Sequence, residues 1–187
     1  MGTETVARLV LVRHGHPRGG YGDDYDPGLD DVGRAQAGAM ADALAGLGRR
    51  PLLVSPLRRT RETAAPLEAR WETVARVESR VGEIPSPTDD LRERTVWLRS
   101  VLASTWAELP SGLHEWRDAL LDTLRGIGED AVVVTHYVAI NAAVGAATGN
   151  PRLISCAPDY CSRTVVDVSA DGFRLVELGE QAVTRVR

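Results

Sequence analysis

The chain has 187 residues, of which 43% are hydrophobic and 26% charged, a composition typical of a soluble globular protein with one sizeable core. We therefore expect a single domain over residues 1–187. The formal net charge of -4 argues against nucleic acid as the main partner, because proteins that bind it usually carry a basic face. Because no apolar run approaches the length of a membrane span, we also expect no membrane partner.

Short apolar runs alternate with helical patterns along the chain. The runs are rich in β-branched residues, as in strands buried on both faces of a parallel sheet, and they cover residues 9–12, 52–54, 74–77 and 131–135. Helical spacing of apolar residues predicts helices over 30–47, 57–69, 90–108, 113–128 and 138–148. The tail predicts a hairpin of strands 164–168 and 173–178 around Asp171-Gly172. This alternation predicts an α/β domain with a mainly parallel sheet.

Two local features carry further expectations. Ser55 and Pro56 precede the second predicted helix, where serine is a common cap and proline is tolerated in the first turn. The loop 19–28 follows the first strand and is rich in glycine and acidic residues. Loops on a rigid scaffold often carry function, so Tyr21 and Tyr25 are candidates for a lid.

The cysteines and histidines show no spacing typical of a metal site. Cys156 and Cys161 are the only cysteines and the four histidines are scattered, so we expect no metal and no cofactor. Reduced thiols are a better expectation than a disulfide, because no secretory signal is apparent at the N-terminus. We therefore expect a cytoplasmic protein.

Polar side chains follow three of the predicted strands at the point where each strand ends. Arg13-His14-Gly15 follows the first strand, Arg58-Arg59 comes soon after the second, and His136 follows the run 131–135. The carboxyl ends of parallel strands meet at one edge of a sheet, where open α/β folds bind their ligands. Neutral imidazole is a nucleophile, and arginine binds phosphate as a planar fork. The pattern predicts phosphoryl transfer through a phosphohistidine.

In order along the chain, these segments resemble the histidine phosphatase superfamily, the group that also contains cofactor-dependent phosphoglycerate mutase. The matching segments are Leu-Val-Arg-His-Gly at 11–15, Leu-Asp-Asp-Val-Gly-Arg-Ala-Gln-Ala at 29–37, Ser-Pro-Leu-Arg-Arg-Thr-Arg-Glu-Thr-Ala at 55–64, Gly-Glu-Ile at 82–84 and Val-Val-Thr-His at 133–136. The resemblance implies a three-layer α/β/α sandwich of the phosphoglycerate mutase type. It also implies a metal-independent phosphomonoesterase.

The resemblance further implies a role for each matching residue. His14 would be the nucleophile, Arg13 and Arg59 would clamp the phosphate, and His136 would donate a further hydrogen bond. Glu83 matches the position of a general acid, a role for which burial would raise its pKa.

Other residues near these motifs are weaker candidates for the site. The carbonyl of Gly15 is a plausible acceptor for the second ring nitrogen of His14, which would fix the imidazole tautomer. Gly15, His16 and Arg58 are additional candidates for substrate binding. Glu78 is the alternative general acid, although its position suggests a strand.

The chain also departs from the family pattern. The Gly-x-Trp-Glu-Gly motif around the acid is missing, Tyr137-Val138 replaces the usual Gly-Gly, and Asn141 stands where an arginine often occurs. The chain lacks room for the insertions with which mutases hold a second phosphate, so a phosphatase is favoured. The alternatives are a phosphoglycerate mutase and a non-catalytic phosphoryl-binding module. The partner is expected to be a small phosphorylated metabolite, a sugar phosphate or a phosphoprotein, and the oligomeric state stays open.

Overall fold

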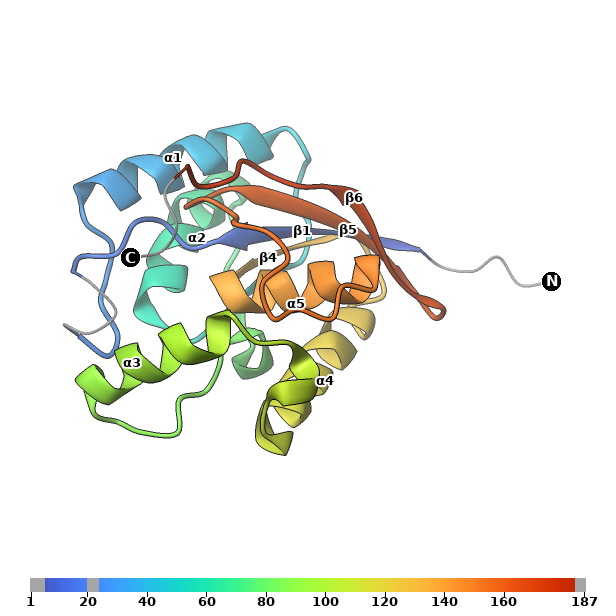
Figure 1. The fold of residues 1–187 in the computed structure, drawn as a ribbon. Helices are drawn as coiled ribbons and strands as arrows, with labels where there is room; N and C mark the ends of the chain where they lie inside the picture. The colour runs from blue at the N-terminus through green and yellow to red at the C-terminus, as the bar shows by residue number, and fades with distance from the viewer. Residues whose placement is uncertain (1–5, 20–23, 184–187) are drawn as a thin grey trace.

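The computed structural model describes residues 6–19 and 24–183, and its strands form a six-stranded sheet of order β3-β2-β4-β1-β5-β6 (Figure 1). The strands are β1 Ala7–Arg13, β2 Leu52–Val54, β3 Arg76–Val77, β4 Ala131–Thr135, β5 Arg163–Ser169 and β6 Gly172–Glu177. Strands β1 to β4 run parallel, whereas the hairpin β5-β6 begins antiparallel to β1. The predicted parallel sheet with a C-terminal hairpin is therefore confirmed.

Helices cover both faces of this sheet, as Figure 1 shows, and they are α1 Asp31–Ala45, α2 Arg58–Trp71, α3 Leu91–Leu102, α4 Ser111–Arg125 and α5 Tyr137–Thr148. Alternate residues of a strand point to opposite faces. In β1, Val10 and Val12 join the core beneath α1 and α2, whereas Leu9 and Leu11 join the core beneath α4 and α5. This arrangement confirms the three-layer α/β/α sandwich.

The prediction of one helix over 90–108 is wrong for its second half. α3 ends at Leu102, and a separate 3-10 turn covers Trp106–Glu108. The helix ends here because residues 104–106 form hydrogen bonds with the later segment 151–153. The Trp106 N–H donates to the Pro151 carbonyl at 2.9 Å, and the Leu153 N–H donates to the Ser104 carbonyl at 3.0 Å.

The strand expected over 74–77 is also shorter than predicted. β3 contains only Arg76–Val77, and Val74 is 87% exposed. The residues before β3 remain tied to the end of α2, because the Thr73 N–H donates to the Glu68 carbonyl and the Ala75 N–H to the Glu68 carboxylate. The first half of the predicted strand is therefore hydrogen-bonded to the end of α2, and only its second half joins the sheet.

The structure also bears on two expectations, that the chain has no membrane-spanning segment and that its cysteines are reduced. Within residues 6–19 and 24–183, no helix combines the length and apolar character needed to cross a membrane. Cys156 and Cys161 are free thiols, and burial raises the pKa of each to about 12. Both cysteines therefore stay protonated at neutral pH and are poor nucleophiles.

Candidate active site

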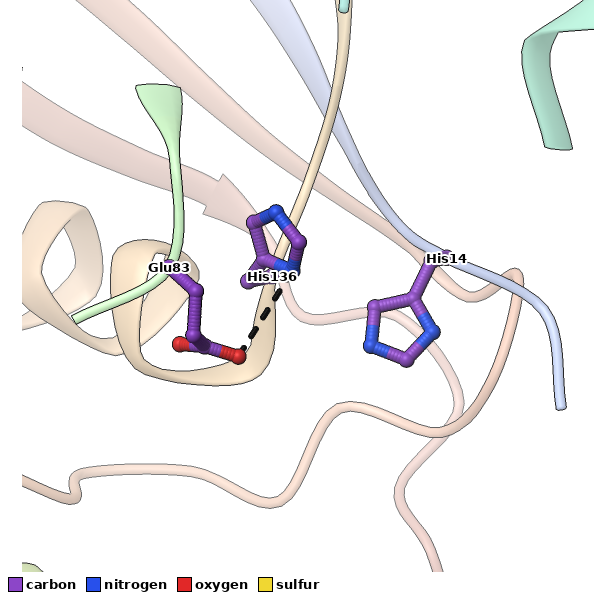
Figure 2. A group of neighbouring side chains, drawn as sticks. All are labelled: His14, Glu83 and His136. Atoms are coloured by element: carbon purple, nitrogen blue, oxygen red, sulfur yellow. Dashed lines mark ion pairs between the residues drawn. The ribbon is translucent and has the colours of Figure 1, made fainter. Parts of the chain in front are cut away.

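Three strand ends meet at the carboxyl edge of the sheet, as the sequence predicts. The His14 N–H donates to the Thr135 carbonyl at 3.0 Å, and the Ser55 N–H donates to the Val134 carbonyl at 3.2 Å. The ladder of β1, β4 and β2 thus continues into the residues that follow these strands. It brings the rings of His14 and His136 to a centroid separation of 5.4 Å (Figure 2).

His14 is held in a single orientation. Its Nδ1 lies 2.8 Å from the Gly15 carbonyl oxygen, which can only accept a hydrogen bond, so Nδ1 carries the proton and Nε2 keeps its lone pair. This contact confirms the prediction made for Gly15. Burial lowers the pKa of His14 well below its ordinary range, and the charges of Arg59 and Arg13 lower it further. The ring is therefore neutral at physiological pH.

The glycine at position 15 is required by close packing. A Cβ atom there would lie 2.7 Å from the Gly33 carbonyl oxygen, which belongs to the backbone of α1. The Gly15 N–H donates to the Thr63 hydroxyl at 2.9 Å, which ties the same turn to α2. The turn that carries His14 is therefore fixed between α1 and α2.

Arg13 is buried and is held by groups at the start of α5 and in the segment after α5. Its guanidinium carbon lies 3.9 Å from the centroid of the Tyr160 ring and 5.0 Å from that of Tyr137. Its Nη1 donates to the Pro158 carbonyl at 2.9 Å. Sequence reasoning missed Tyr160 and Pro158, because the segment after α5 carries no motif and no periodicity.

Arg59 lies in the first turn of α2 and its side chain is only 6% exposed. Its Nη2 is 3.3 Å from Nδ1 of His136 and 3.7 Å from a carboxylate oxygen of Glu83. Its Nη1 is 4.0 Å from a carboxylate oxygen of Asp26. Both predicted arginines, Arg13 and Arg59, line the same cavity as His14.

Glu83 lies beside Arg59 and His136, in the segment that follows the short 3-10 turn Ser79–Val81. Its Oε2 lies 3.5 Å from Nδ1 of His136, as Figure 2 shows, and its side chain is 14% exposed. Burial raises the pKa of this carboxyl, and the nearby Arg59 charge only partly opposes the rise. The alternative acid, Glu78, accepts a hydrogen bond from the Arg80 N–H at 3.1 Å. It does not line the cavity at this edge of the sheet, to which Arg13, His14, Arg59 and Glu83 contribute.

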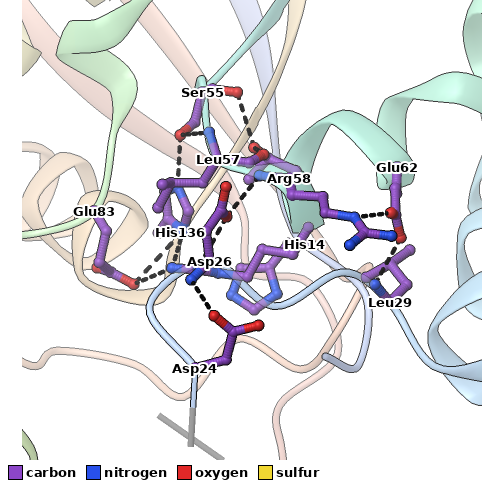
Figure 3. A network of polar contacts seen from close by, with 12 residues as sticks. His14, Asp24, Asp26, Leu29, Ser55, Leu57, Arg58, Glu62, Glu83 and His136 are labelled. Carbon is purple, nitrogen blue, oxygen red and sulfur yellow. Dashed lines mark hydrogen bonds and ion pairs between the residues drawn. The ribbon is translucent and has the colours of Figure 1, made fainter. Parts of the chain in front are cut away.

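His136 is fully buried, and its Nε2 lies 2.8 Å from the hydroxyl of Ser55 (Figure 3). The expectation that Ser55 caps α2 is wrong, since Leu57 is the N-cap residue. The Ser55 hydroxyl accepts only a long contact, 3.4 Å, from the Leu57 N–H. The Arg59 guanidinium can only donate, so Nδ1 of His136 accepts in their 3.3 Å contact and Nε2 donates to the Ser55 hydroxyl. Because a serine hydroxyl can also donate, Ser55 is compatible with the other tautomer of His136 as well.

The start of α2 is capped from a distant loop. The Arg58 N–H donates to an Asp26 carboxylate oxygen at 2.7 Å, and the Asp26 N–H donates to Asp24 at 3.1 Å (Figure 3). The side chain of Arg58 turns to Glu62, with 2.6 Å between its Nε and Oε1. Arg58 therefore does not line the cavity, and sequence reasoning missed the capping role of Asp26.

His16 also lies outside the cavity. Its side chain is 46% exposed, and its Nδ1 is 2.8 Å from a carboxylate oxygen of Asp30, the N-cap of α1. The edge of its ring faces Tyr160 at a centroid distance of 5.0 Å. Tyr21, one of the two lid candidates, lies outside the described residues, whereas Tyr25 lines the cavity.

The cavity at this edge has a volume of about 450 Å³, within the range of sites for small molecules. His14, Glu83 and His136 offer ligand atoms within 4.8 Å of one another, a spacing that suits a metal ion. The buried charges of Arg13 and Arg59 beside them would repel a cation. Two buried arginines with two histidines and one carboxyl are better suited to an anion such as phosphate.

Comparisons with known proteins agree with this geometry. The sequence model of the histidine phosphatase superfamily (branch 1) matches residues 9–181. An uncharacterized protein of Mycobacterium tuberculosis, Rv0525, is 31% identical over 193 residues, covering 91% of this chain and 94% of that protein. A glucosyl-3-phosphoglycerate phosphatase of the same species is 40% identical over 82 residues, covering 41% of this chain and 36% of that protein.

Solved structures show the same fold. A protein described as mycobacterial hydrolase 1 superposes with a TM-score of 0.70 at 24% identity, covering 95% of this chain and all of the other. A mycobacterial glucosyl-3-phosphoglycerate phosphatase in complex with VO3 gives a TM-score of 0.66 at 23% identity, with 94% of this chain covered and all of the other. Because the family model spans most of the sequence, the chain belongs to the histidine phosphatase superfamily, branch 1.

Proposed function

We propose that the protein is a metal-independent phosphomonoesterase that works through a phosphohistidine on His14. The observation that carries this proposal is the state of the imidazole. Nδ1 donates to the Gly15 carbonyl, while burial and two arginines keep the ring neutral, so Nε2 is available as a nucleophile. Family membership and the named relatives support a phosphatase.

The substrate phosphate would bind between the two arginines. Arg13 and Arg59 would donate to its oxygens. His136 would donate from Nδ1 once Arg59 donates to the phosphate instead of to Nδ1 and the Ser55 hydroxyl donates to Nε2. These donors are held in place before substrate arrives, so they stabilise the charge that spreads over the phosphoryl oxygens in the transition state. Loss of one such donor costs roughly a hundredfold to a thousandfold in rate.

The first step would transfer the phosphoryl group to the enzyme. The Nε2 lone pair of His14 forms a bond to phosphorus while the ester P–O bond breaks on the opposite side. Glu83 gives its proton to the departing oxygen, a role that suits a carboxyl whose pKa is raised by burial. The alcohol leaves neutral, Glu83 becomes ionised, and His14 carries the phosphoryl group.

The second step would return the enzyme to its starting state. A water molecule attacks phosphorus, and the Glu83 carboxylate accepts its proton. The P–N bond breaks, and its electron pair returns to Nε2 of His14. Inorganic phosphate leaves, and Glu83 is protonated again.

Hydrolysis of p-nitrophenyl phosphate in the presence of EDTA tests this proposal. The wild type should be active, and His14→Ala should lose at least about a thousandfold in kcat/KM, as expected for removal of a nucleophile. His114→Ala is a matched control, since His114 lies on α4 and does not line the cavity. Equal activity of His14→Ala and wild type would refute the phosphohistidine mechanism.

The mutase and binding-module alternatives are separated by two further measurements. A mutase would exchange the isomers of phosphoglycerate and would depend on a bisphosphorylated primer, whereas the proposed hydrolase would release inorganic phosphate from 3-phosphoglycerate or leave it unchanged. A binding module would bind phosphate without turnover of any ester.

A further inference from the structure

The described lining of the cavity has few cationic side chains. Among the described residues that line it, Arg13 and Arg59 are the only cations, and both belong to the proposed phosphate clamp. Arg94 of α3 is buried, and its guanidinium carbon lies 4.3 Å from the centroid of the Tyr25 ring. Tyr25 lines the cavity and Arg94 does not. The described lining therefore offers no cation for a second anionic group of a substrate.

Apart from the two arginines and Glu83, the charged groups of the described lining are acidic. Asp24 and Asp159 both line the cavity. Two hydrogen bonds position Asp159. Its backbone N–H donates to the Glu180 carbonyl at 2.8 Å, and its carboxylate accepts from the Tyr160 N–H at 2.7 Å. A carboxylate or a second phosphate on the substrate would face these acids without a partner, which is unfavourable in a partly desolvated cavity.

The rest of the described lining is mostly apolar or aromatic. Leu98 and Leu102 lie four residues apart on α3, so they share one face of the helix, and both line the cavity. Tyr137 and Tyr160, the rings beside Arg13, line it as well. A substrate group that reaches past the phosphate would therefore contact leucine side chains and tyrosine rings.

We propose that the substrate is a phosphate monoester of an uncharged aromatic or bulky apolar alcohol, with no second anionic group. This inference rests on the proposed phosphatase function, and it names the alcohol that the cavity favours. The clamp binds the phosphate, the α3 leucines and the tyrosines bury the apolar alcohol, and Asp24 and Asp159 exclude carboxylated esters.

A matched pair of esters isolates the effect of charge. 4-Carbamoylphenyl phosphate and 4-carboxyphenyl phosphate have nearly the same size and differ by one negative charge. We expect kcat/KM to be at least about tenfold higher for the amide, a ratio that corresponds to about 1.4 kcal/mol. Asp159→Asn should narrow this ratio, whereas Glu129→Gln, an exposed residue that does not line the cavity, should leave it unchanged.

The apolar wall is tested by a pair of substitutions on α3. Leu98→Ser should lower kcat/KM for 1-naphthyl phosphate by roughly threefold to tenfold, from the apolar area no longer buried, and leave methyl phosphate nearly unchanged. Val96→Ser is the control, because Val96 is on the same helix and is 70% exposed. An equal loss for both esters would contradict a role of Leu98 in binding the alcohol.

Binding of phosphonates separates this inference from the mechanism. Benzylphosphonate and 4-carboxybenzylphosphonate cannot be hydrolysed, so their dissociation constants can be measured by calorimetry whether or not the protein turns over esters. Tighter binding of benzylphosphonate supports the proposed substrate class even if His14→Ala refutes the phosphohistidine. Equal or tighter binding of the carboxylated compound overturns the inference while leaving a phosphatase mechanism intact.

Discussion

Substitution of Glu83 by glutamine tests whether this residue donates the proton to the leaving group. Glutamine has nearly the size of a protonated glutamate, and it can still contact Arg59 and His136, which lie 3.7 Å and 3.5 Å from Oε2. The change therefore removes the transferable proton and leaves the packing of the site almost unaltered.

The size of the loss should depend on the leaving group. An alkyl phosphate expels a strongly basic oxygen and needs a proton from the enzyme, so Glu83→Gln should lower its kcat/KM by roughly a hundredfold to ten-thousandfold. p-Nitrophenolate is weakly basic and departs without help, so its loss should stay below about tenfold. The ratio of the two losses, about tenfold or more, is the predicted quantity.

Steady-state kinetics on both esters gives this ratio directly. The parameter to compare is kcat/KM, because it reports the steps up to cleavage of the ester and excludes hydrolysis of the phosphohistidine. Glu78→Gln is the matched control, since Glu78 is the other candidate acid and does not line the cavity. Equal losses on the two esters would show that Glu83 does not act as the proton donor.

Three further predictions concern stability. Gly15→Ala should lower the free energy of unfolding by about 1–3 kcal/mol in urea denaturation, since its Cβ would overlap the Gly33 carbonyl at 2.7 Å; an unchanged midpoint would contradict the close packing. Ser55→Ala should cost about 1–3 kcal/mol because Nε2 of His136 loses its buried partner, whereas no loss would mean that the ring is satisfied otherwise. Burial lowers the pKa of His14 and His136, so the unfolded chain takes up their protons first. The unfolding free energy should therefore fall as pH drops below about 6.5, by at most about 2.7 kcal/mol per pH unit. The raised pKa of Glu83 acts in the opposite direction, so the profile is measured on Glu83→Gln, where a flat profile between pH 7.5 and 5.5 would refute those shifts.

Much of the fold and of the site core follows from local sequence. The run at 131–135 is β-branched and buried throughout, and it forms the central strand β4. Arg13 ends a strand of the same kind and His14 follows it, so the parallel sheet alone brings them to the edge where His136 lies. Even the contact between His14 and the Gly15 carbonyl is predictable, because it joins neighbouring residues.

Long-range contacts set the parts that were not predictable. α3 stops at Leu102, and a segment about fifty residues later pairs with the chain beyond it. The local signal for this break is the capping box of Thr105 and Glu108, whereas the pairing itself has no local signal. The sequence makes Arg58 an additional candidate for substrate binding beside Arg59, yet adjacent positions on a helix face different directions, and Arg58 turns to Glu62. Tyr160 follows α5 in an irregular segment, so its place beside Arg13 depends on the whole fold.

A single cause, burial, sets both protonation states that the proposed mechanism needs. It lowers the pKa of His14, which keeps the nucleophile neutral, and it raises the pKa of Glu83, which favours the protonated acid. The two groups do not depend on burial equally. An exposed histidine, with a pKa near 6.5, is still mostly neutral at pH 7, whereas an exposed glutamate, with a pKa near 4.3, is ionised. Any change that admits water to this cavity would therefore disable the acid before it disables the nucleophile.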